Sequence, residues 1–510
     1  MLPESIRHFI GGREAYSSYR KTFGVPDPAT GKELTRVEIG VGADINQAVL
    51  AASAALEADP WARLPAGERA GILERIADGI ESRADQIANF EALGTGLPVT
   101  QARVQAGRAA GCFRLAAAAI AAAAEDRFPS AGRSGYPLRR PAGVAGVVTS
   151  WRAAFLGQAR AVAPALAAGC TVVLQPDVWA PLSAALLPEI TTGAGLPGGV
   201  LNIVHGTGDW RGTSGGGTAA RDALIAHPRV PLLSLAGDAA TVDQGARDAA
   251  AHRKRLSADP AGNSPCVIFA DANLDRAADS ATFGAFSLNG GRRTAASRIL
   301  AERPVYDSVV GRLAERAGRI RVGDPTDPST ELGPLVHLEL RDRVMSRARV
   351  AIREDARLAA GGRRPPGLTE GNYLSPIVLA GVTPEMRIFS EVISGPVACV
   401  TPFDTEEEAV ALANAVNANT GNANTGNAKA GNAKAGNATA GAPAAYIWTA
   451  DPRRARRLAT AIDSPVAWVN AHNADDLRNP PGGADGIDFY TQSSVIHVAA
   501  DDGPVPWLGG

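Results

Sequence analysis

Three short stretches, GVAGVV (143–148), CTVVLQ (170–175) and VLNIVH (200–205), decide the fold of this chain. Each is a run of apolar residues, and the segments between them carry the apolar spacing of helices. Buried strands of this length that alternate with helices are typical of a parallel, doubly wound sheet. We therefore predict an α/β fold with a Rossmann-type sheet built around residues 143–205.

The same alternation continues on both sides of this block. Apolar residues recur at helical spacing upstream, where Asp44 can cap the first helix. Downstream, a second block of strands and helices follows, and the tail 489–500 has the alternation of an exposed strand. The predicted helices are 44–94 (more than one), 113–124, 154–168, 181–193, 218–226, 272–288, 304–318 and 338–353, and the further predicted strands are 230–235, 266–270 and 298–302.

Length, charge and cysteine content exclude several function classes. The chain has 510 residues, and 51 Lys and Arg against 52 Asp and Glu give a formal net charge of −1. This balance argues against a general polyanion-binding surface, so we expect no nucleic-acid partner and no membrane partner. The cysteines lie far apart and the histidines lack metal-ligand spacing, so we expect no disulfide scaffold and no metal. Without a recognisable signal peptide, a cytoplasmic protein is expected.

Residues 416–440 differ in kind from the rest of the chain. They read VNANT-GNANT-GNAKA-GNAKA-GNATA, five pentads with no large side chain after Val416. Such a segment cannot bury enough apolar area to offset the entropy lost on ordering. We predict a disordered, low-complexity surface insertion, with a tether or docking loop as the alternative.

A set of short motifs occurs along the chain. They are PAGVAGVVTSW (141–151), PALAAGCTVVLQP (164–176), GLPGGVLNIVHGTG (195–208), NSPCVIFADANLD (263–275), TAASRI (294–299), GDPTDPSTELGPLV (323–336), YLSPIV (373–378), SEVISGPV (390–397), VAWVN (466–470) and PPGG (480–483). Each motif alone is weak, but together they are specific for a fold. Their order and spacing resemble the aldehyde dehydrogenase family from about residue 8 to 500.

The resemblance implies a division into three parts. A cofactor-type, Rossmann-like domain is expected over 1–122 and 142–256, and a catalytic-type domain over 257–470. An oligomerisation arm is expected from 123–141 and 489–500. Such arms share sheet edges between subunits, so a homo-oligomer is the default expectation.

The family's reaction needs a cysteine thiolate that attacks the aldehyde, and this chain departs from that pattern. Arg293 occupies the position of the nucleophile. The position of the oxyanion donor, an Asn in the family, is Arg152, and that of the general base, a Glu, is Asp259. A guanidinium stays protonated and cannot attack a carbonyl carbon. Whether any enzyme activity remains is left open by these substitutions.

The family's cofactor positions are substituted as well. Gln175 and Val178 replace a Lys and a Glu that hold the adenosine ribose, and Val392 replaces a Glu at the nicotinamide ribose. At the turn that receives the pyrophosphate the residues are Gly237 and Asp238, and Asp238 places a carboxylate at a helix N-terminus that favours anions. Trp151 completes the set of cofactor positions. We therefore expect no cofactor, or NAD or NADP if the protein is active.

Three functional hypotheses follow from these substitutions. The first is a catalytically inactive member of the family that acts as a structural or regulatory subunit, as a homo-oligomer or in a hetero-oligomer with an active paralogue. The second is an NAD(P)-dependent oxidoreductase that acts on aldehydes with non-standard residues. In the third, Arg152 and Arg293, which the family fold would bring together with Asp259, bind a small anion or carboxylate, and the protein is a sensor.

Overall fold

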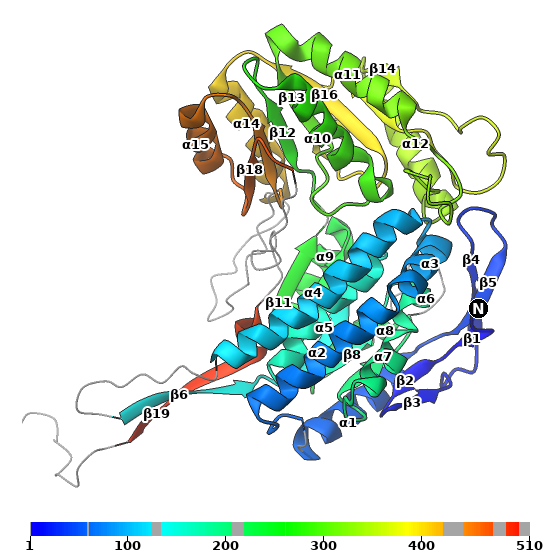
Figure 1. Cartoon of the computed structure of the whole chain (residues 1–510), viewed down its shortest axis with the longest axis vertical. Helices are drawn as coiled ribbons and strands as arrows, with labels where there is room; N and C mark the ends of the chain where they lie inside the picture. Colours follow the sequence, from blue (N-terminus) through cyan, green and yellow to red (C-terminus); the bar gives the residue numbers. More distant parts are fainter. Residues whose placement is uncertain are drawn as a thin grey trace, which may run out of the picture.

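The parallel strands predicted around residues 143–205 form the centre of one of two large sheets. The computed structural model describes residues 2–58, 61–123, 134–206, 219–260, 262–421, 442–472 and 486–498. Figure 1 shows two lobes, the lower one built around the first sheet and the upper one around the second, and a two-stranded ribbon that projects from the lower lobe. The predicted α/β fold class is confirmed.

The first sheet has seven strands in the order β11-β10-β7-β8-β9-β2-β3. The pairs from β11 to β9 are parallel, whereas β2 pairs antiparallel with both β9 and β3. The central strands consist of buried apolar residues, as expected of a sheet covered on both faces. The strands are β2 (His8–Ile10), β3 (Arg13–Ala15), β7 (Val144–Val148), β8 (Thr171–Gln175), β9 (Leu201–Ile203), β10 (Leu232–Gly237) and β11 (Arg255–Pro260).

Helices cover both faces of the first sheet. One apolar core joins the sheet to α2, α4, α5 and α7, and a second joins it to α1 and α8. The helices are α1 (Gly42–Ala58), α2 (Ala66–Ser82), α3 (Ala84–Thr95), α4 (Val99–Ala123), α5 (Ala154–Ala167), α6 (Pro181–Ala184), α7 (Leu187–Gly193), α8 (Ala219–Ala226) and α9 (Ala239–Ala251).

The second sheet also has seven strands, in the order β14-β15-β16-β13-β12-β17-β18. All neighbours are parallel except β14, which pairs antiparallel with β15. The strands are β12 (Pro265–Ile268), β13 (Arg298–Glu302), β14 (Arg357–Ala360), β15 (Ile377–Ala380), β16 (Val397–Phe403), β17 (Ala445–Trp448) and β18 (Ala467–Val469).

Two apolar cores again lie on opposite faces of this sheet. One includes residues of α12, α13, α14 and α15, and the other residues of α10 and α11. The helices, with three short 3-10 turns, are α10 (Leu274–Phe286), η1 (Ser287–Gly290), η2 (Arg303–Val305), α11 (Tyr306–Arg319), α12 (Leu338–Arg353), α13 (Arg387–Ser390), α14 (Glu406–Gly421), α15 (Pro452–Ala461) and η3 (Ile487–Tyr490).

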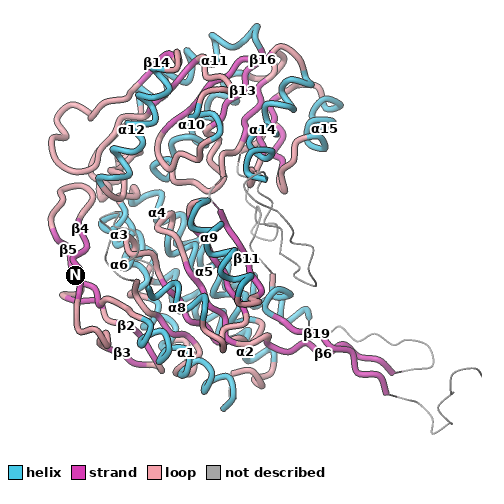
Figure 2. Tube along the Cα trace, turned by 180° about the vertical axis from the view of Figure 1, so that it is seen from behind, coloured by secondary structure: helices cyan, strands magenta, loops and turns pink. Residues whose placement is uncertain are grey.

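Two small sheets complete the fold. β1 (Ser5–Ile6), β5 (Glu33–Glu38) and β4 (Thr22–Pro26) form one. In the other, β6 (Ser134–Pro141) pairs antiparallel with β19 (Thr491–Val498) along their whole length. Figures 1 and 2 both show this ribbon projecting away from the two lobes. β6 and β19 lie within the two segments that we expected to form an oligomerisation arm.

Some predicted elements differ from the observed ones. The segment 181–193 forms two short helices, α6 and α7, because the chain turns at 185–186. α14 continues as helix to Gly421, so the first residues of the pentad repeat are not a loop. The rest of the repeat and residues 124–133 of the expected arm lie outside the described residues. β11 extends the first sheet to Pro260, past the domain boundary expected at 256.

Candidate functional site

The loop that follows α10 carries Arg293 and has an unusual backbone. Leu288, Asn289 and Gly290 have φ angles of 54°, 55° and 71°, three consecutive residues in the left-handed region. A Cβ on Gly290 would lie 2.1 Å from the carbonyl carbon of Gly395, so only glycine allows this approach. The loop is therefore pressed directly against the segment 391–397, which contains Val392.

The side chain of Asn289 fixes this loop to its surroundings. Its Nδ2 donates to the carbonyl oxygens of Gly96 at 2.8 Å and Pro334 at 3.1 Å. Its Oδ1 accepts a 2.9 Å hydrogen bond from the backbone N–H of Gly333. Since Asn tolerates the left-handed region better than most residues, it suits both the backbone and the bonds. The arginines that follow are thus carried by a firmly held loop.

Arg293 forms an ion pair with Asp259, which lies on β11 of the first sheet. Nη1 of Arg293 is 3.0 Å from Oδ1 of Asp259, and the two side chains are only 16% and 25% exposed. Burial lowers the pKa of the Arg293 guanidinium, and the charge of Asp259 opposes that shift. The pair joins the two lobes and keeps the guanidinium charged. The two residues that the resemblance assigns to the nucleophile and the general base therefore bind each other.

Arg152 lies just before α5 and bonds to different partners. Its Nη1 donates to Oγ of Ser150 at 3.2 Å, and its Nη2 donates to Oγ of Ser394 in the other lobe. Its guanidinium carbon is 4.9 Å from the centre of the Trp151 ring. Burial lowers the pKa of Arg152, and the charges of Asp238, Asp177 and Asp259, in that order, oppose the shift. Arg152 thus lies near Asp259 without forming an ion pair with it.

The residues at the adenosine-ribose positions carry no charge. Gln175 ends β8, and its Oε1 is buried without a hydrogen-bond partner. A Cβ on Gly206 would lie 2.9 Å from Nε2 of Gln175 and 3.1 Å from Cγ1 of Val178. Both side chains therefore face Gly206, the last residue described before the segment 207–218.

A carboxylate occupies the helix N-terminus that follows Gly237. Asp238 is the N-cap of α9, and its Oδ1 accepts a 2.8 Å hydrogen bond from the backbone N–H of Thr241. A phosphate at this helix N-terminus would compete with that carboxylate for the same donors. With a half-buried Val392 at the nicotinamide-ribose position, the residues present do not fit the contacts that the resemblance implies for NAD or NADP.

None of the four cysteines of the chain supplies a replacement thiolate. Cys170, Cys266 and Cys399 are buried, and Cys112 is half-buried. Burial raises the pKa of Cys112 and of Cys170 to about 11, and that of Cys266 and of Cys399 to about 12. At neutral pH these thiols are protonated and are weak nucleophiles.

Two carboxyl groups that the sequence did not single out, a half-buried Asp177 and a buried Glu91, support the region around Arg152. Asp177 accepts hydrogen bonds from the backbone N–H groups of Trp151 at 3.1 Å and Trp179 at 3.0 Å, and burial raises its pKa to about 6. Glu91 of α3 accepts from Ala154 at 3.1 Å and Phe155 at 3.2 Å, the first residues of α5. Glu91 has no local motif, because its role depends on the packing of α3 against α5.

Within the described residues, no group of three or more His, Cys, Asp or Glu side chains could hold a metal ion. The same part of the chain has no helix that is long and apolar enough to cross a membrane.

Comparisons with known proteins identify relatives along nearly the whole chain. The model of the aldehyde dehydrogenase family matches residues 15–425. The chain is 38% identical over 489 residues to 5-carboxymethyl-2-hydroxymuconate semialdehyde dehydrogenase of Escherichia coli, a match that covers 94% of this chain and 96% of that protein. It is 33% identical over 515 residues to 2-hydroxymuconic semialdehyde dehydrogenase of a Pseudomonas strain, a match that covers 97% and 99%.

Solved structures agree with these sequence matches. HpcC of Thermus thermophilus superimposes with a TM-score of 0.87 at 39% identity, covering 99% of this chain and 95% of the other. An aldehyde dehydrogenase of Bacillus cereus, solved as an NAD+ complex, superimposes with a TM-score of 0.87 at 30% identity, covering 98% of each chain.

Proposed function

This chain belongs to the aldehyde dehydrogenase family, and we propose that it has lost the covalent chemistry of that family and acts as a structural or regulatory subunit. The ion pair of Arg293 with Asp259 carries the proposal. The family reaction begins when a thiolate attacks the aldehyde carbon. A protonated guanidinium that is paired with a carboxylate has no electron pair to donate.

The surroundings of this pair support the same proposal. The buried, protonated cysteines offer no substitute nucleophile. The carboxylate of Asp259 is also engaged by the Arg293 guanidinium at 3.0 Å, so it is not positioned to accept a proton from another group. The ion pair of Arg293 with Asp259 therefore disfavours both nucleophilic attack and proton transfer at these positions.

We extend the proposal to the cofactor. NAD(P)+ would supply the hydride acceptor when bound to a family member. Here the carboxylate of Asp238 caps α9, and Arg152 reaches across to Ser394 beside Val392. These side chains favour contacts within the chain over contacts with a dinucleotide, so we infer weak or absent binding of NAD and NADP.

The proposed subunit role rests on the ribbon of β6 and β19. A two-stranded sheet is marginally stable alone, and this one pairs with neither large sheet within the described residues. Its free edges suit pairing with a second copy or with an active paralogue that keeps the same edge. The assembly is then a homo-oligomer or a hetero-oligomer of family members in the cytoplasm.

A second candidate function is an NAD(P)-dependent oxidoreductase that uses non-standard residues. The 38% identity to a named semialdehyde dehydrogenase favours this alternative. Such an enzyme would need Asp259 as a base, and therefore a rearrangement that frees it from Arg293.

Turnover assays separate the two candidates. The purified chain is mixed with NAD+ or NADP+ and 2-hydroxymuconic semialdehyde or simpler aldehydes, with the Pseudomonas relative as positive control. We expect no NAD(P)H above the enzyme-free rate. Saturable NAD(P)H formation that is abolished in Asp259→Ala, in a variant that melts cooperatively, would establish the oxidoreductase and overturn the proposal.

A further inference from the structure

One exposed surface of the upper lobe takes no part in the proposed function. It consists of the last turns of α12 and of β14, the edge strand of the second sheet, and is here called the α12–β14 surface. Figures 1 and 2 both show α12 and β14 at the end of the molecule opposite the ribbon of β6 and β19. The segment 338–364 has eight Arg against four Asp and Glu, although the whole chain is nearly neutral. Positive charge is therefore concentrated locally on this surface.

Three arginines of the α12–β14 surface have no carboxylate partner. The side chains of Arg349, Arg353 and Arg357 are exposed, and within the described residues none of them forms an ion pair or a hydrogen bond. Glu354 lies between two of them in the sequence, but its carboxylate accepts a 3.2 Å hydrogen bond from the backbone N–H of Arg387. Arg349 and Arg353 are also four residues apart on one helix, where like charges repel and destabilise the helix.

The neighbouring helix α11 shows that this arrangement is not the rule on the upper lobe. Each of its arginines forms an ion pair with a carboxylate, namely Arg312 with Asp275, Arg316 with Asp279 and Arg319 with Glu315. The charges at the end of α12 are therefore not explained by contacts within the fold.

Two large apolar side chains are exposed among these arginines. Ile352 of α12 and Leu358 of β14 are each 41% exposed. Ile352 follows Arg349 by three residues, so the two share one face of the helix. Leu358 follows Arg357 directly in the edge strand. Such a mixture of positive and apolar side chains complements a segment that carries both acidic and apolar residues.

β14 also presents a strand edge that nothing covers in the part of the chain that the structure describes. It pairs antiparallel with β15 on one side and with no strand on the other. The free N–H and C=O groups of an edge strand are a template for a further strand. A second copy of the same edge is disfavoured, because the arginines of the two copies would repel and the register shifts between Leu358 and Ala360. An acidic strand would meet no such repulsion.

We propose that the α12–β14 surface binds an extended acidic segment of a partner protein, which adds as a strand to the free edge of β14. Carboxylates of the segment pair with Arg349, Arg353 and Arg357, and its apolar side chains cover Ile352 and Leu358. The inference goes beyond the proposed function, since neither Arg293 nor the ribbon takes part in it.

Fluorescence anisotropy of a labelled peptide with alternating glutamate and valine tests the proposal on the full chain, without cofactor or aldehyde. We expect saturable binding that is weakened about tenfold or more in Arg353→Glu. A peptide of the same sequence with alternate backbone nitrogens methylated keeps its charges but loses donors to β14. It should also bind about tenfold more weakly, because strand addition depends on main-chain hydrogen bonds.

Arg276→Glu is the matched control, because Arg276 lies on α10 of the same lobe, is exposed and has no ion pair among the described residues. It makes the same change in charge and should leave the affinity unchanged. Equal weakening in both variants would mean that net charge alone attracts the peptide, and would overturn the site. The proposal would also be overturned by undiminished binding of the methylated peptide, by equally tight binding of a single-stranded oligonucleotide, or by no binding of the peptide to the native chain.

Discussion

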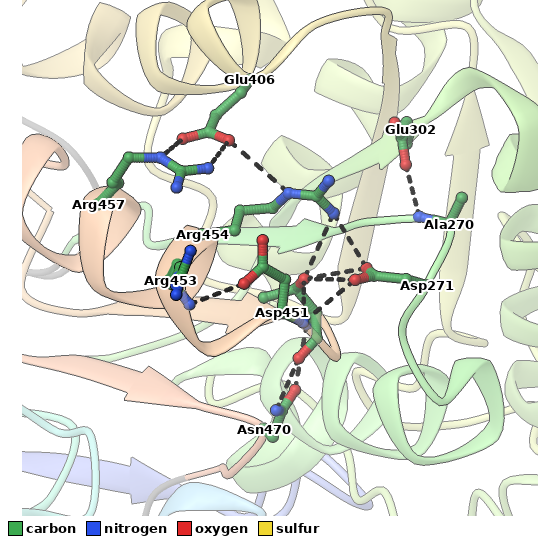
Figure 3. A network of polar contacts seen from close by, with 10 residues as sticks. Ala270, Asp271, Glu302, Glu406, Asp451, Arg453, Arg454, Arg457 and Asn470 are labelled. Atoms are coloured by element: carbon green, nitrogen blue, oxygen red, sulfur yellow. Dashed lines mark hydrogen bonds and ion pairs between the residues drawn. The ribbon is translucent and has the colours of Figure 1, made fainter.

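Two groups of arginines in this molecule differ in whether every guanidinium forms an ion pair with a carboxylate. In the network of Figure 3, Arg454 lies 3.1 Å from Asp271 and 3.7 Å from Glu406, and Arg457 lies 2.7 Å from Glu406. In the second group, Arg108, Arg160, Arg292 and Arg293, called the arginine cluster, Nη2 of Arg160 is buried without a hydrogen-bond partner. Burial, with a smaller contribution from a neighbouring guanidinium, lowers the pKa of the other three arginines. Nε of Arg454 also lacks a hydrogen bond, but Arg454 and Arg457 each form an ion pair with a carboxylate, whereas Arg160 forms none within the described residues.

The position of each group explains the difference. The Figure 3 network joins α14 and α15 to the end of β12, where Asp271 also accepts hydrogen bonds from Thr449 Oγ1 at 2.9 Å. Its partners are fixed elements of one lobe. The arginine cluster lies where α4 and α5 meet the loop that carries Arg293. The resemblance places the family's nucleophile on that loop, and we propose that a charged side chain replaces it here.

The largest effect is expected from Asp259→Asn. It leaves the largely buried Arg293 without its carboxylate, and we expect the free energy of unfolding to fall by about 3 kcal/mol. Urea unfolding measures this loss. The double variant Asp259→Asn with Arg293→Met removes both charges and should recover most of it. A double variant as unstable as the single one would show that the pair contributes through packing instead.

A comparable effect, dependent on pH, is expected from Glu91. Burial raises its pKa from the ordinary 4.5 to about 7, although hydrogen bonds from Ser183, Phe155 and Ala154 oppose the shift. Between these values the folded protein holds a proton that the unfolded chain has released. The free energy of unfolding should therefore fall as pH rises from about 4.5 through about 7, by about 3 kcal/mol from this group.

Glu91→Gln isolates that contribution. The difference in unfolding free energy between the native chain and Glu91→Gln is measured across this pH range, which cancels the effect of Asp177 and other groups. We expect the difference to change steadily in favour of the variant as pH rises. A difference that is flat with pH would mean that the Glu91 carboxyl titrates normally.

A smaller effect with the opposite sign is expected from Arg160→Met. In the absence of an anion, replacing a partly buried, unanswered charge with an apolar side chain of similar length should raise the free energy of unfolding by about 1 kcal/mol. Thermal and urea unfolding in chloride buffer measure the gain. A clear loss of stability would indicate that Arg160 makes a stabilising contact within the folded chain.

The smallest effect is expected from Arg454→Met in the balanced network. Its side chain is 27% exposed, and its pairs with Asp271 and Glu406 are screened by solvent and salt. We expect a loss of less than about 1 kcal/mol, smaller still at high ionic strength. A large loss of unfolding free energy that does not change with salt would show that the ion pairs of Arg454 are shielded from solvent. The two groups of arginines would then not differ as described.

The sequence predicted those features that depend on local pattern or on the order of motifs. The strands around 143–205 and the cap Asp238 follow from local residues. The prediction that Asp44 caps the first helix was wrong, because α1 begins at Gly42 and the Asp44 carboxylate, inside its first turn, accepts from the backbone N–H of Val41. The assignment of Arg293, Asp259 and Arg152 to catalytic positions rests on the resemblance and stays a prediction.

The features that it did not predict depend on tertiary contacts. Glu91 reaches the start of α5 only because α3 packs there. The burial of Arg160 Nη2 without a hydrogen-bond partner likewise depends on how the helices pack. α14 was not among the predicted helices, and it runs into the start of the pentad repeat as far as Gly421.

We propose that Arg293 stands where the family has its nucleophile, and that Asp238 occupies the helix N-terminus where the family binds the cofactor. A titration of the purified chain with NAD+, followed by melting temperature and by the fluorescence of Trp151 and Trp179 at the site, tests it most directly. We predict no change at millimolar NAD+. A saturable rise in stability, which would reach about 2.7 kcal/mol at a hundred times the Kd, would contradict the account and show that a dinucleotide binds despite Asp238, Val178 and Val392.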